Sequence, residues 1–258
     1  MTSLPELWAD GGITFGGWMT LASSVASETA ARAGFDYVCC DLQHGVVDYQ
    51  ESIAMMQGTL LGGSNPVCRV PWNEPGIIGK LLDGGSTGII APMVNTRAEA
   101  EAMVRACRYA PAGSRSYGPV VSGMREKDYF EGSKNVAVIP MIETVEAIRN
   151  LDEILSTPGI TAIYVGPADL SVTLGLPPGN NDDRTEFTDA LKTIVAGCRK
   201  HGVVAGIHST GALAPIRVEM GFQMITVAGD LLAMRAKMGE ELAQARGAAK
   251  PTASKSVY

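Results

Sequence analysis

The sequence lacks the features that mark membrane proteins and nucleic-acid-binding proteins. It contains no apolar stretch that approaches the ~20 residues needed to cross a bilayer. The net charge of −6 arises without a long run of one sign, and Lys and Arg form no cluster of the kind that binds nucleic acids or anionic membranes. Residues 1–10 contain neither a basic segment nor an apolar core of signal-peptide length. We therefore expect a cytoplasmic protein that binds neither nucleic acid nor a membrane.

Cysteine is scarce and is not arranged for disulfides or zinc. Five cysteines are present, an odd number, and no two are spaced as CxxC. A GxGxxG motif is also missing after the first strand-like segment, which removes the main support for a dinucleotide-binding domain. No lysine falls at the carboxyl end of a strand-like segment, so a Schiff-base mechanism lacks its nucleophile. These absences favour a cytoplasmic enzyme with reduced thiols.

What the sequence does have is the length and the alternation of an α/β barrel. Its 258 residues, 46% of them hydrophobic, suit two small domains or one barrel, since a barrel runs to ~250 residues as a single domain. Strand-like segments cover residues 14–19, 37–40, 66–70, 88–91, 136–142, 162–165, 203–207 and 224–227. Segments of helical character follow them at 24–33, 49–60, 77–83, 96–109, 145–155, 184–201, 211–220 and 230–246.

Eight successive β–α units predict a single (β/α)8 TIM barrel over residues 1–246. Many of the strand-like segments are continuously apolar, as in parallel strands that are buried on both faces. An open doubly wound sheet is the alternative, because periodicity alone does not distinguish the two. Thr96 and Glu99 have the spacing of a capping box at the start of a helix. The tail, 247–258, is small and polar and is expected to be disordered.

Polar residues directly follow several strand-like segments. They are Asp41 and His44 after the second, Arg69 at the end of the third, Glu143 after the fifth and Asp169 after the sixth. Because the catalytic groups of a barrel gather at the carboxyl ends of its strands, we expect these residues around one pocket. Structural explanations exist for each: a helix N-cap for Asp169, an ion pair for Arg69 and a helix-dipole contact for Glu143. His44 alone would more often be a hydrogen-bonded structural residue. Their convergence favours the functional interpretation.

The chemistry of this set is coherent. Two carboxylates without clustered Cys or His make an oxygen-rich site suited to Mg²⁺ or Mn²⁺. Such a site leaves positions open for water and for a 2-oxo acid, which chelates through its carboxylate and oxo groups. Arg69 would stabilise the negative oxygen of an enolate, and His44 would move the proton. An aldolase with these residues and no suitable lysine should use a metal ion.

Seven short motifs occur in a fixed order along the chain. They are Gly34-Phe35-Asp36, Asp41-x-x-His44-Gly45, Arg69-Val70-Pro71, Leu82-Asp83-x-Gly85, Pro92-Met93-Val94, Ile142-Glu143-Thr144 and Gly166-Pro167-Ala168-Asp169-Leu170-Ser171. Each is a weak signal alone, but together they are strong. On these motifs the sequence, from about residue 15 to residue 228, resembles the class II pyruvate aldolases. That family is typified by 4-hydroxy-2-oxoheptanedioate aldolase, 2-dehydro-3-deoxyglucarate aldolase and 2-keto-3-deoxy-L-rhamnonate aldolase.

The resemblance implies a role for each residue of the motifs. It makes His44 the proton acceptor, and it makes Asp83 the acid that raises the basicity of His44. Arg69 would stabilise the developing enolate. Glu143 and Asp169 would hold a divalent metal ion (Mg²⁺ or Mn²⁺, with Co²⁺ as a further candidate). The substrate carboxylate or oxo group would be met near Ala168 and Asp169, partly by backbone amides.

The resemblance also implies a homo-oligomer, commonly a hexamer with exchanged C-terminal helices. Leu231, Leu232, Met234 and Met238 would provide an apolar face for that contact. The same stripe is equally compatible with packing within one chain.

Two departures from the family pattern bear on the substrate. Gln43 stands where many relatives have Glu, and Met141 stands where the best-described members place a Gln that contacts substrate. We expect the metal and base chemistry to survive both changes, while substrate preference shifts. Trp18 would either line the pocket or pack in the hydrophobic core. His208, at the end of the seventh strand-like segment, is a further candidate for substrate contact. In the loop 111–129, Arg115 or Arg125 would meet a distal carboxylate, although a solvated arginine is the favoured interpretation.

Three functional hypotheses remain at this point. The leading one is an aldolase that cleaves a 4-hydroxy-2-oxo acid into pyruvate, or a close 2-oxo acid, and an aldehyde, and that also catalyses the reverse addition. The second keeps the metal and the enolate but changes the reaction to decarboxylation or to cleavage of an acyl-CoA. A CoA substrate would favour a basic patch for its phosphates, and the sequence has no Lys/Arg cluster. The third is a catalytically silent barrel that only binds a small oxo acid or a partner.

Overall fold

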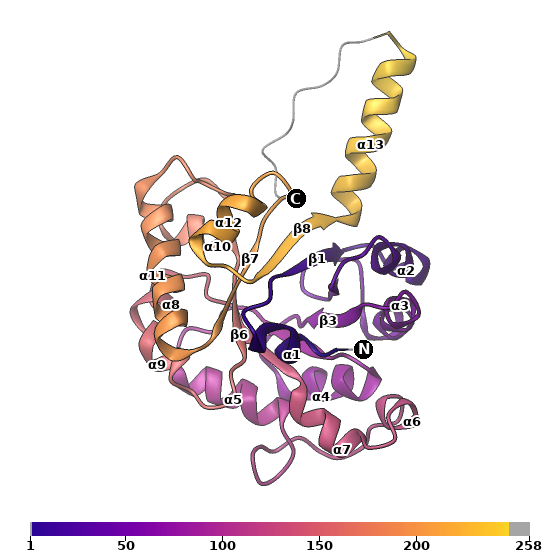
Figure 1. Ribbon diagram of the computed structural model, residues 1–258, viewed down its shortest axis with the longest axis vertical. Coiled ribbons are helices and arrows are strands. Elements are labelled where there is room, and N and C mark those ends of the chain that lie inside the picture. Colours follow the sequence, from indigo (N-terminus) through magenta and orange to yellow (C-terminus); the bar gives the residue numbers. More distant parts are fainter. Residues whose placement is uncertain (1, 248–258) are drawn as a thin grey trace.

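The computed structural model describes residues 2–247 and shows eight parallel β-strands surrounded by helices (Figure 1). The strands are β1 (Thr14–Met19), β2 (Tyr37–Asp41), β3 (Asn65–Arg69), β4 (Gly88–Ala91), β5 (Ala137–Pro140), β6 (Ala162–Val165), β7 (Val204–His208) and β8 (Met224–Gly229). Each strand begins within one residue of its predicted start, because the apolar runs have sharp polar or glycine boundaries. Apart from Gly247, the tail predicted to be disordered lies outside the described residues.

Hydrogen bonds join the strands in the order β5-β4-β3-β2-β1-β8-β7-β6, and every pair is parallel. The remaining seam, between β5 and β6, is also bridged. Met141 forms a parallel bridge with Tyr164, and the N–H of Ile142 donates to the carbonyl of Tyr164 at 2.9 Å. Lower on this seam, the N–H of Thr161 donates to the carbonyl of Val138 at 3.1 Å. The prediction of a (β/α)8 TIM barrel is confirmed, and the open sheet is excluded.

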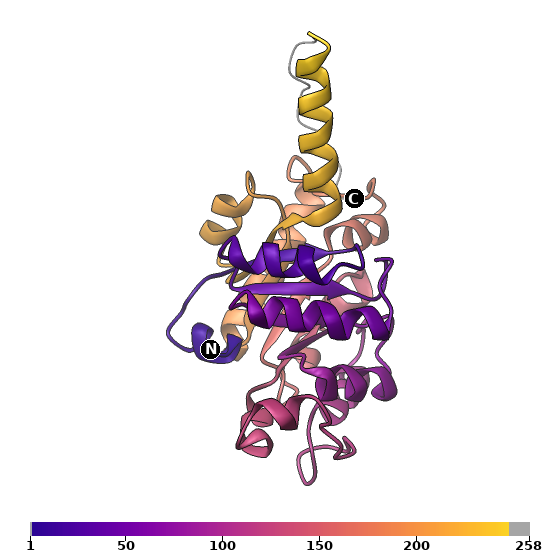
Figure 2. The same cartoon turned by 90° about the vertical axis from the view of Figure 1, so that its right-hand side faces the viewer.

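Helices cover the outside of the barrel (Figures 1 and 2). The principal ones are α2 (Ser24–Arg32), α3 (Tyr49–Leu61), α4 (Pro75–Gly84), α5 (Arg97–Cys107), α8 (Val145–Arg149), α9 (Leu151–Leu155), α11 (Thr185–His201) and α12 (Ala214–Met220). The predicted capping box is present at α5. Thr96 Oγ1 accepts from the N–H of Glu99 at 3.3 Å, and the Glu99 carboxylate accepts from the N–H of Thr96 at 2.9 Å. This reciprocal pair satisfies two donors that the start of the helix would leave unpaired.

Several short elements were not predicted. They are α1 (Leu4–Ala9), α6 (Ser122–Arg125), α7 (Tyr129–Gly132) and α10 (Pro167–Thr173), with a 3-10 turn at Ser133–Asn135. Ser3 and Glu6 form a capping box at α1, a signal that is present in the sequence. The segment 145–155, predicted as one helix, divides at Asn150. The Asn150 side chain donates to the carbonyl of Asn95, 55 positions away in the sequence, at 2.8 Å.

The barrel interior is a packed core, and α1 closes its amino-terminal end. Leu4 and Trp8 of α1 are buried, and the indole N–H of Trp8 donates to Thr14 Oγ1 at 3.0 Å. The buried interior side chains include Trp18, Tyr37, Cys39, Val67, Ile90, Ile139, Met141, Tyr164 and Met224. The ring of Tyr37 takes the space beside Gly16, where a Cβ would lie 2.0 Å from Cζ of the ring. A filled interior leaves the rim at the carboxyl ends of the strands as the place for chemistry.

The last described helix, α13 (Asp230–Ala245), leaves the barrel and projects away from it (Figures 1 and 2). None of its residues is buried within the single chain. Leu231, Met234, Met238 and Leu242 are exposed and lie three or four positions apart, so they form an apolar stripe along one side of the helix. Within residues 2–247, no helix is long and apolar enough to cross a bilayer.

Candidate active site

A small cavity at the carboxyl ends of the strands brings together most of the predicted site residues. Its lining consists of Trp18, Arg69, Met141, Glu143, Tyr164, Gly166, Pro167, Ala168, Asp169 and His208. The strands β1, β3, β6 and β7 and the segments that follow β5 and β6 contribute these side chains. The volume of the cavity is about 10 Å³, which is close to what one water molecule needs.

Arg69 is fixed at the cavity by a bidentate ion pair with Asp41. Arg69 Nε donates to Asp41 Oδ1 at 2.8 Å, and Nη2 donates to Oδ2 at 2.6 Å. Both side chains are buried, 3% and 0% exposed, and β2 and β3 pair so that the two residues face each other. Burial alone would raise the pKa of Asp41, but the hydrogen bonds and charge of Arg69 hold it below its usual value. Arg69 therefore both forms a structural ion pair and lines the cavity.

Asp41 also organises the neighbouring groups of the rim. Its Oδ2 accepts from the indole N–H of Trp18 at 3.1 Å, and the guanidinium carbon of Arg69 lies 4.9 Å from the centre of that indole ring. Its Oδ1 accepts from the backbone N–H groups of Gln43 at 3.0 Å and of His44 at 3.2 Å. One buried carboxylate thus positions the arginine, the tryptophan and the start of the loop after β2.

Glu143 is the buried carboxylate of the cavity, with 2% exposure. Its Oε1 accepts from the backbone N–H of Met93 at 2.8 Å, and Met93 adopts φ 56°, a left-handed conformation that is unusual for methionine. Burial raises the pKa of Glu143 to about 7; the charge of Asp169 adds to this, while Met93 and Arg69 oppose it. The start of α8 is capped by Thr144, whose Oγ1 accepts from the backbone N–H of residue 147 at 2.9 Å. Glu143 is therefore not needed as a helix-start residue.

Asp169 lies in the first turn of α10 and is exposed at the cavity. The N-cap of this helix is Gly166, and no side chain caps it, so the N-cap interpretation of Asp169 does not hold. A Cβ on Gly166 would lie 2.4 Å from Glu143 Oε2 and 2.9 Å from Met141 Cε. Only glycine lets the Glu143 carboxylate lie against the backbone at the end of β6.

The pair of carboxylates fits a divalent cation. Glu143 and Asp169 line one cavity, and the charge of Asp169 disfavours ionisation of Glu143. A hard cation between them would remove that repulsion, and carboxylate oxygen is the donor that Mg²⁺ and Mn²⁺ prefer. Among residues 2–247 no group of three or more His, Cys, Asp or Glu side chains is gathered for a metal. A site here would therefore rely on two protein carboxylates and on ligands from water or substrate.

His208 ends β7 and packs edge-on against Trp18, with ring centroids 5.0 Å apart. Its Nδ1 lies 3.4 Å from the hydroxyl of Tyr164, which donates to Thr226 Oγ1 at 2.5 Å. Burial and the positive charge of Arg69 lower the pKa of His208 to about 4, so the ring is neutral near pH 7. Tyr164 and Gly166 are lining residues that sequence reasoning missed. Tyr164 lies inside a buried apolar strand, where a phenol is not distinguished from core.

His44 and Asp83 are not part of this cavity within one chain. The His44 side chain is exposed on the loop after β2. Asp83 lies in the last turn of α4, which leads into the start of β4, so it is at the amino-terminal end of the barrel. There its Oδ1 accepts from Arg115 Nη2 at 2.6 Å. The single chain therefore separates the two residues that the resemblance pairs.

The loop after α5 also differs from expectation at Arg115. This arginine is buried, not solvated, because it pairs with Asp83, donates to the Tyr129 hydroxyl at 2.6 Å and lies 4.5 Å from the Tyr109 ring. Arg125 is exposed, as favoured. Both lie at the amino-terminal end of the barrel, so neither meets a substrate at the rim of the same chain.

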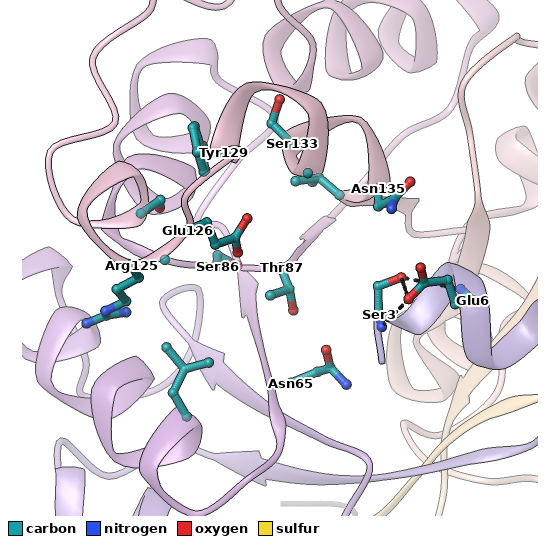
Figure 3. A pocket seen from close by; sticks show the side chains of 15 residues that line it. Ser3, Glu6, Asn65, Ser86, Thr87, Arg125, Glu126, Tyr129, Ser133 and Asn135 are labelled. Atoms are coloured by element: carbon teal, nitrogen blue, oxygen red, sulfur yellow. Dashed lines mark hydrogen bonds between the residues drawn. The ribbon is translucent and has the colours of Figure 1, made fainter. Parts of the chain in front are cut away.

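A larger cavity lies at that end too, with a volume of about 500 Å³ (Figure 3). Figure 3 shows Arg125 and Glu126 on one side of it and Ser3 with Glu6 on the other. The carboxylate of Glu6 is already bound to Ser3 by hydrogen bonds of 2.8 Å. Arg125 lines this cavity, but the residues predicted at the carboxyl ends of the strands do not, so its size does not make it the active site.

Comparison with known proteins agrees with the fold. The family model described as HpcH/HpaI aldolase/citrate lyase matches residues 14–235. A hydroxypyruvate/pyruvate aldolase of Rhizorhabdus wittichii is 36% identical over 249 residues, which cover 95% of this chain and 99% of that protein. A 4-hydroxy-2-oxo-heptane-1,7-dioate aldolase of Escherichia coli is 34% identical over 93% of each chain.

A solved structure supports the same assignment. The crystal structure of a HpcH/HpaI aldolase/citrate lyase family protein from Burkholderia cenocepacia J2315 gives a TM-score of 0.88 at 29% identity. The alignment covers 95% of this chain and 100% of that one. The resemblance inferred from the seven motifs is confirmed: the chain belongs to the HpcH/HpaI aldolase/citrate lyase family.

Proposed function

We propose that the chain is a metal-dependent aldolase that cleaves 4-hydroxy-2-oxo acids into pyruvate, or a close 2-oxo acid, and an aldehyde, and that also catalyses the reverse addition. The observation that carries this proposal is the cavity in which Arg69 lies beside the carboxylates of Glu143 and Asp169. The two relatives described above are aldolases whose names refer to 2-oxo acids. An enolate is the carbon nucleophile that such an aldolase needs, and a fixed arginine suits its negative oxygen.

Glu143 and Asp169 are the residues that would hold a Mg²⁺ or Mn²⁺ ion, with Co²⁺ as a further candidate. When bound, the ion would supply Lewis-acid polarisation of the oxo group and charge for the enolate. Arg69, aimed by Asp41, would donate hydrogen bonds to the same oxygen as negative charge develops. The backbone N–H groups of Ala168 and Asp169 belong to the first turn of α10 and have no acceptor within the helix, so they suit the substrate carboxylate.

We assign the proton transfer to His44. In cleavage, His44 takes the proton of the C4 hydroxyl, the electron pair of that O–H bond forms the aldehyde carbonyl, and the C3–C4 pair passes to the enolate. Protonation of C3 then gives the 2-oxo acid. The backbone N–H of His44 is anchored to Asp41, which ties the base to the carboxylate that aims Arg69.

The separation of His44 from Asp83 leads to a proposal on assembly. If Asp83 raises the basicity of His44, the carboxylate has to come from a second copy of the chain, since Asp83 lies at the opposite end of its own barrel. The exposed apolar stripe of α13 supports a homo-oligomer, for which a hexamer is the expectation. Mixed oligomers of His44→Ala and Asp83→Ala chains should then regain activity that neither variant has alone. Mixtures as inactive as the separate variants would refute shared sites.

Loss of the methyl proton signal of pyruvate in D2O, followed by NMR, tests the enolate chemistry without the unknown aldehyde. We expect exchange with the purified protein, loss of exchange after chelator treatment, and recovery with Mn²⁺ or Mg²⁺. His44→Ala and Glu143→Gln should both lower the rate, and Lys192→Ala, on the outer surface of α11, is the matched control. Absence of exchange under every condition would refute pyruvate enolisation. Exchange that persists unchanged after chelator treatment would refute the requirement for a metal ion.

The same experiment separates the remaining hypotheses. A barrel that only binds an oxo acid gives no exchange with or without metal. An acyl-CoA lyase would need cations for the CoA phosphates, whereas among residues 2–247 Arg69 is the one Lys or Arg that lines the cavity, and it is already paired with Asp41. We therefore favour the aldolase over the lyase.

A further inference from the structure

Arg217 of α12 is a fully buried cation that the proposed active site does not use. Its Nη1 and Nη2 donate to the two carboxylate oxygens of Asp182 at 2.6 and 2.9 Å, and Nη2 also donates to Asn180 Oδ1 at 3.0 Å. Its Nε is buried and has no hydrogen-bond partner within residues 2–247. Such a pair is weak evidence for stability, because apolar residues of similar volume often stabilise a fold as well. Its bidentate geometry instead fixes where Asp182 lies.

Asp182 belongs to the loop 174–184, which joins α10 to α11. The same loop is fastened to α10 at Ser171, whose side chain is fully buried. The side-chain amide of Asn181 donates to Ser171 Oγ at 2.8 Å, and Ser171 Oγ donates to the carbonyl of Gly179 at 2.8 Å. A chain of hydrogen bonds therefore runs from Arg217 on α12, through this loop, to α10.

Asp169 depends on α10 for its position. Glu143 is held by burial and by the N–H of Met93. The Asp169 carboxylate is exposed at the cavity and accepts no hydrogen bond from any residue within 2–247. Residues two positions apart lie on different faces of a helix, so Asp169 faces the cavity while Ser171 faces the loop. The place of the Asp169 carboxylate relative to Glu143 therefore follows from where the backbone of α10 is held.

We propose that Arg217 is a positioning residue: through Asp182 and the loop 174–184 it holds α10 where the Asp169 carboxylate reaches a divalent cation shared with Glu143. This inference rests on the proposed function, in which the two carboxylates hold the ion. Arg217 does not line the cavity, so its effect passes through the backbone of α10. Replacing residues that orient metal ligands lowers metal affinity by about 10–100-fold. Because Arg217 acts through a loop, we expect the lower end of that range.

Binding of Mn²⁺ to the full-length protein tests the proposal without any turnover. The electron paramagnetic resonance signal of free Mn²⁺ falls as the ion binds, and a titration gives Kd. Arg217→Met keeps an unbranched side chain but donates no hydrogen bond, and it should raise Kd about tenfold. Arg217→Lys keeps the charge but not the bidentate pair, so it should recover part of the loss. Asp182→Asn, at a side chain that is 32% exposed, should raise Kd by a smaller factor.

Val104→Ala is the matched control for a loss of stability. Val104 is buried in α5 and does not line the cavity. Loss of its methyl groups leaves a small void and lowers Tm, but it should leave Kd for Mn²⁺ unchanged. If Arg217→Met raises Kd no more than Val104→Ala does, Arg217 has only a structural role and the inference is overturned.

The outcomes also separate this inference from the function on which it rests. If wild-type protein binds no Mn²⁺, the proposed metal site fails first and the role of Arg217 falls with it. If wild-type protein binds Mn²⁺ and folded Arg217→Met binds it with the same Kd, only the role of Arg217 is refuted. Circular dichroism checks the fold of each variant. If Arg217→Met does not fold, Asp182→Asn decides, and a wild-type Kd in that variant refutes the inference.

Discussion

The interaction on which the site depends most is the buried pair of Asp41 and Arg69, and replacing Asp41 by Ala tests it. Asp41 is fully buried and accepts hydrogen bonds from Arg69, Trp18 and the N–H groups that begin the loop of His44. Asp41→Ala leaves the guanidinium buried without its counter-charge. Removing one partner of a buried pair reduces the free energy of unfolding by about 3–5 kcal/mol. For a domain of this size each kcal/mol lowers Tm by about 2–4 °C, so we expect a loss of roughly 6–20 °C.

The assay is urea denaturation at pH 7, with the midpoint and the slope both recorded. A fall in the midpoint at constant slope reports a change in stability alone. The double variant Asp41→Leu/Arg69→Met should regain much of the stability, because an apolar pair leaves no charge unpaired. Glu101→Ala is the matched control: its partner Arg97 is about half exposed, and a surface pair contributes at most ~1 kcal/mol. A loss below ~1 kcal/mol for Asp41→Ala would refute the reasoning.

The same variant should lose activity as well as stability. Asp41 aims the guanidinium, and misplacement of a catalytic group by ~1 Å costs about 10²-fold in rate. Because the folded state holds the pKa of Asp41 below its usual value, the pair stabilises the protein above pH 3.8 and that contribution is lost as pH falls further. Wild-type protein should therefore lose stability at acid pH more steeply than Asp41→Ala does, and pH-dependent denaturation curves measure the difference.

Two further predictions follow from the cavity walls. Gly166→Ala places a Cβ only 2.4 Å from Glu143 Oε2, so the carboxylate has to move, and kcat/KM should fall about 10²-fold. Gly79→Ala is the control: its Cβ meets no atom within 4 Å, so kcat/KM should stay unchanged. Burial lowers the pKa of His208 from 6.5 to about 4, so the unfolded chain binds a proton across that window and the folded chain does not. His208→Asn should abolish this contribution, about 3 kcal/mol between pH 6.5 and 4, which denaturation at several pH values will show; equal pH dependence in both proteins would contradict it.

The barrel was predictable because its strands are continuous apolar runs that end at polar residues. The short helices were not, since α6, α7 and α10 depend on contacts made only in the fold. Ser122 illustrates this: its hydroxyl donates to the carbonyl of Leu82 at 2.6 Å, far away in the sequence. Pattern reasoning finds periodicity, and elements of four to seven residues carry too little of it.

The cavity was largely predictable for the same geometric reason. Arg69, Glu143, Asp169 and His208 each end or follow a strand, and barrel closure gathers them on one rim. Spacing could not reveal Gly166, because its importance lies in the absence of a Cβ beside a carboxylate from another strand.

The pairing of His44 with Asp83, which the resemblance implies, cannot occur within one chain. Sequence order places Asp83 at the end of a helix, and the closed barrel then puts that end on the side away from the rim. No sequence pattern predicts which residue of a second copy of the chain lies near His44. The role of Asp83 towards His44 therefore stays a prediction, and the mixed-oligomer experiment bears on it directly.

Charge balance links the fold of the rim to the proposed chemistry. Asp41 and Arg69 neutralise each other in a bidentate pair, so the charge of the arginine offsets only part of the charge of Glu143 and Asp169. When both of those carboxylates are ionised, two negative charges surround a cavity of about 10 Å³. A 2-oxo acid brings a third negative charge, and in a poorly hydrated site like charges at such distances repel strongly. One divalent cation would balance both protein carboxylates and attract the substrate carboxylate, so binding of the proposed cation and of the oxo acid should be coupled.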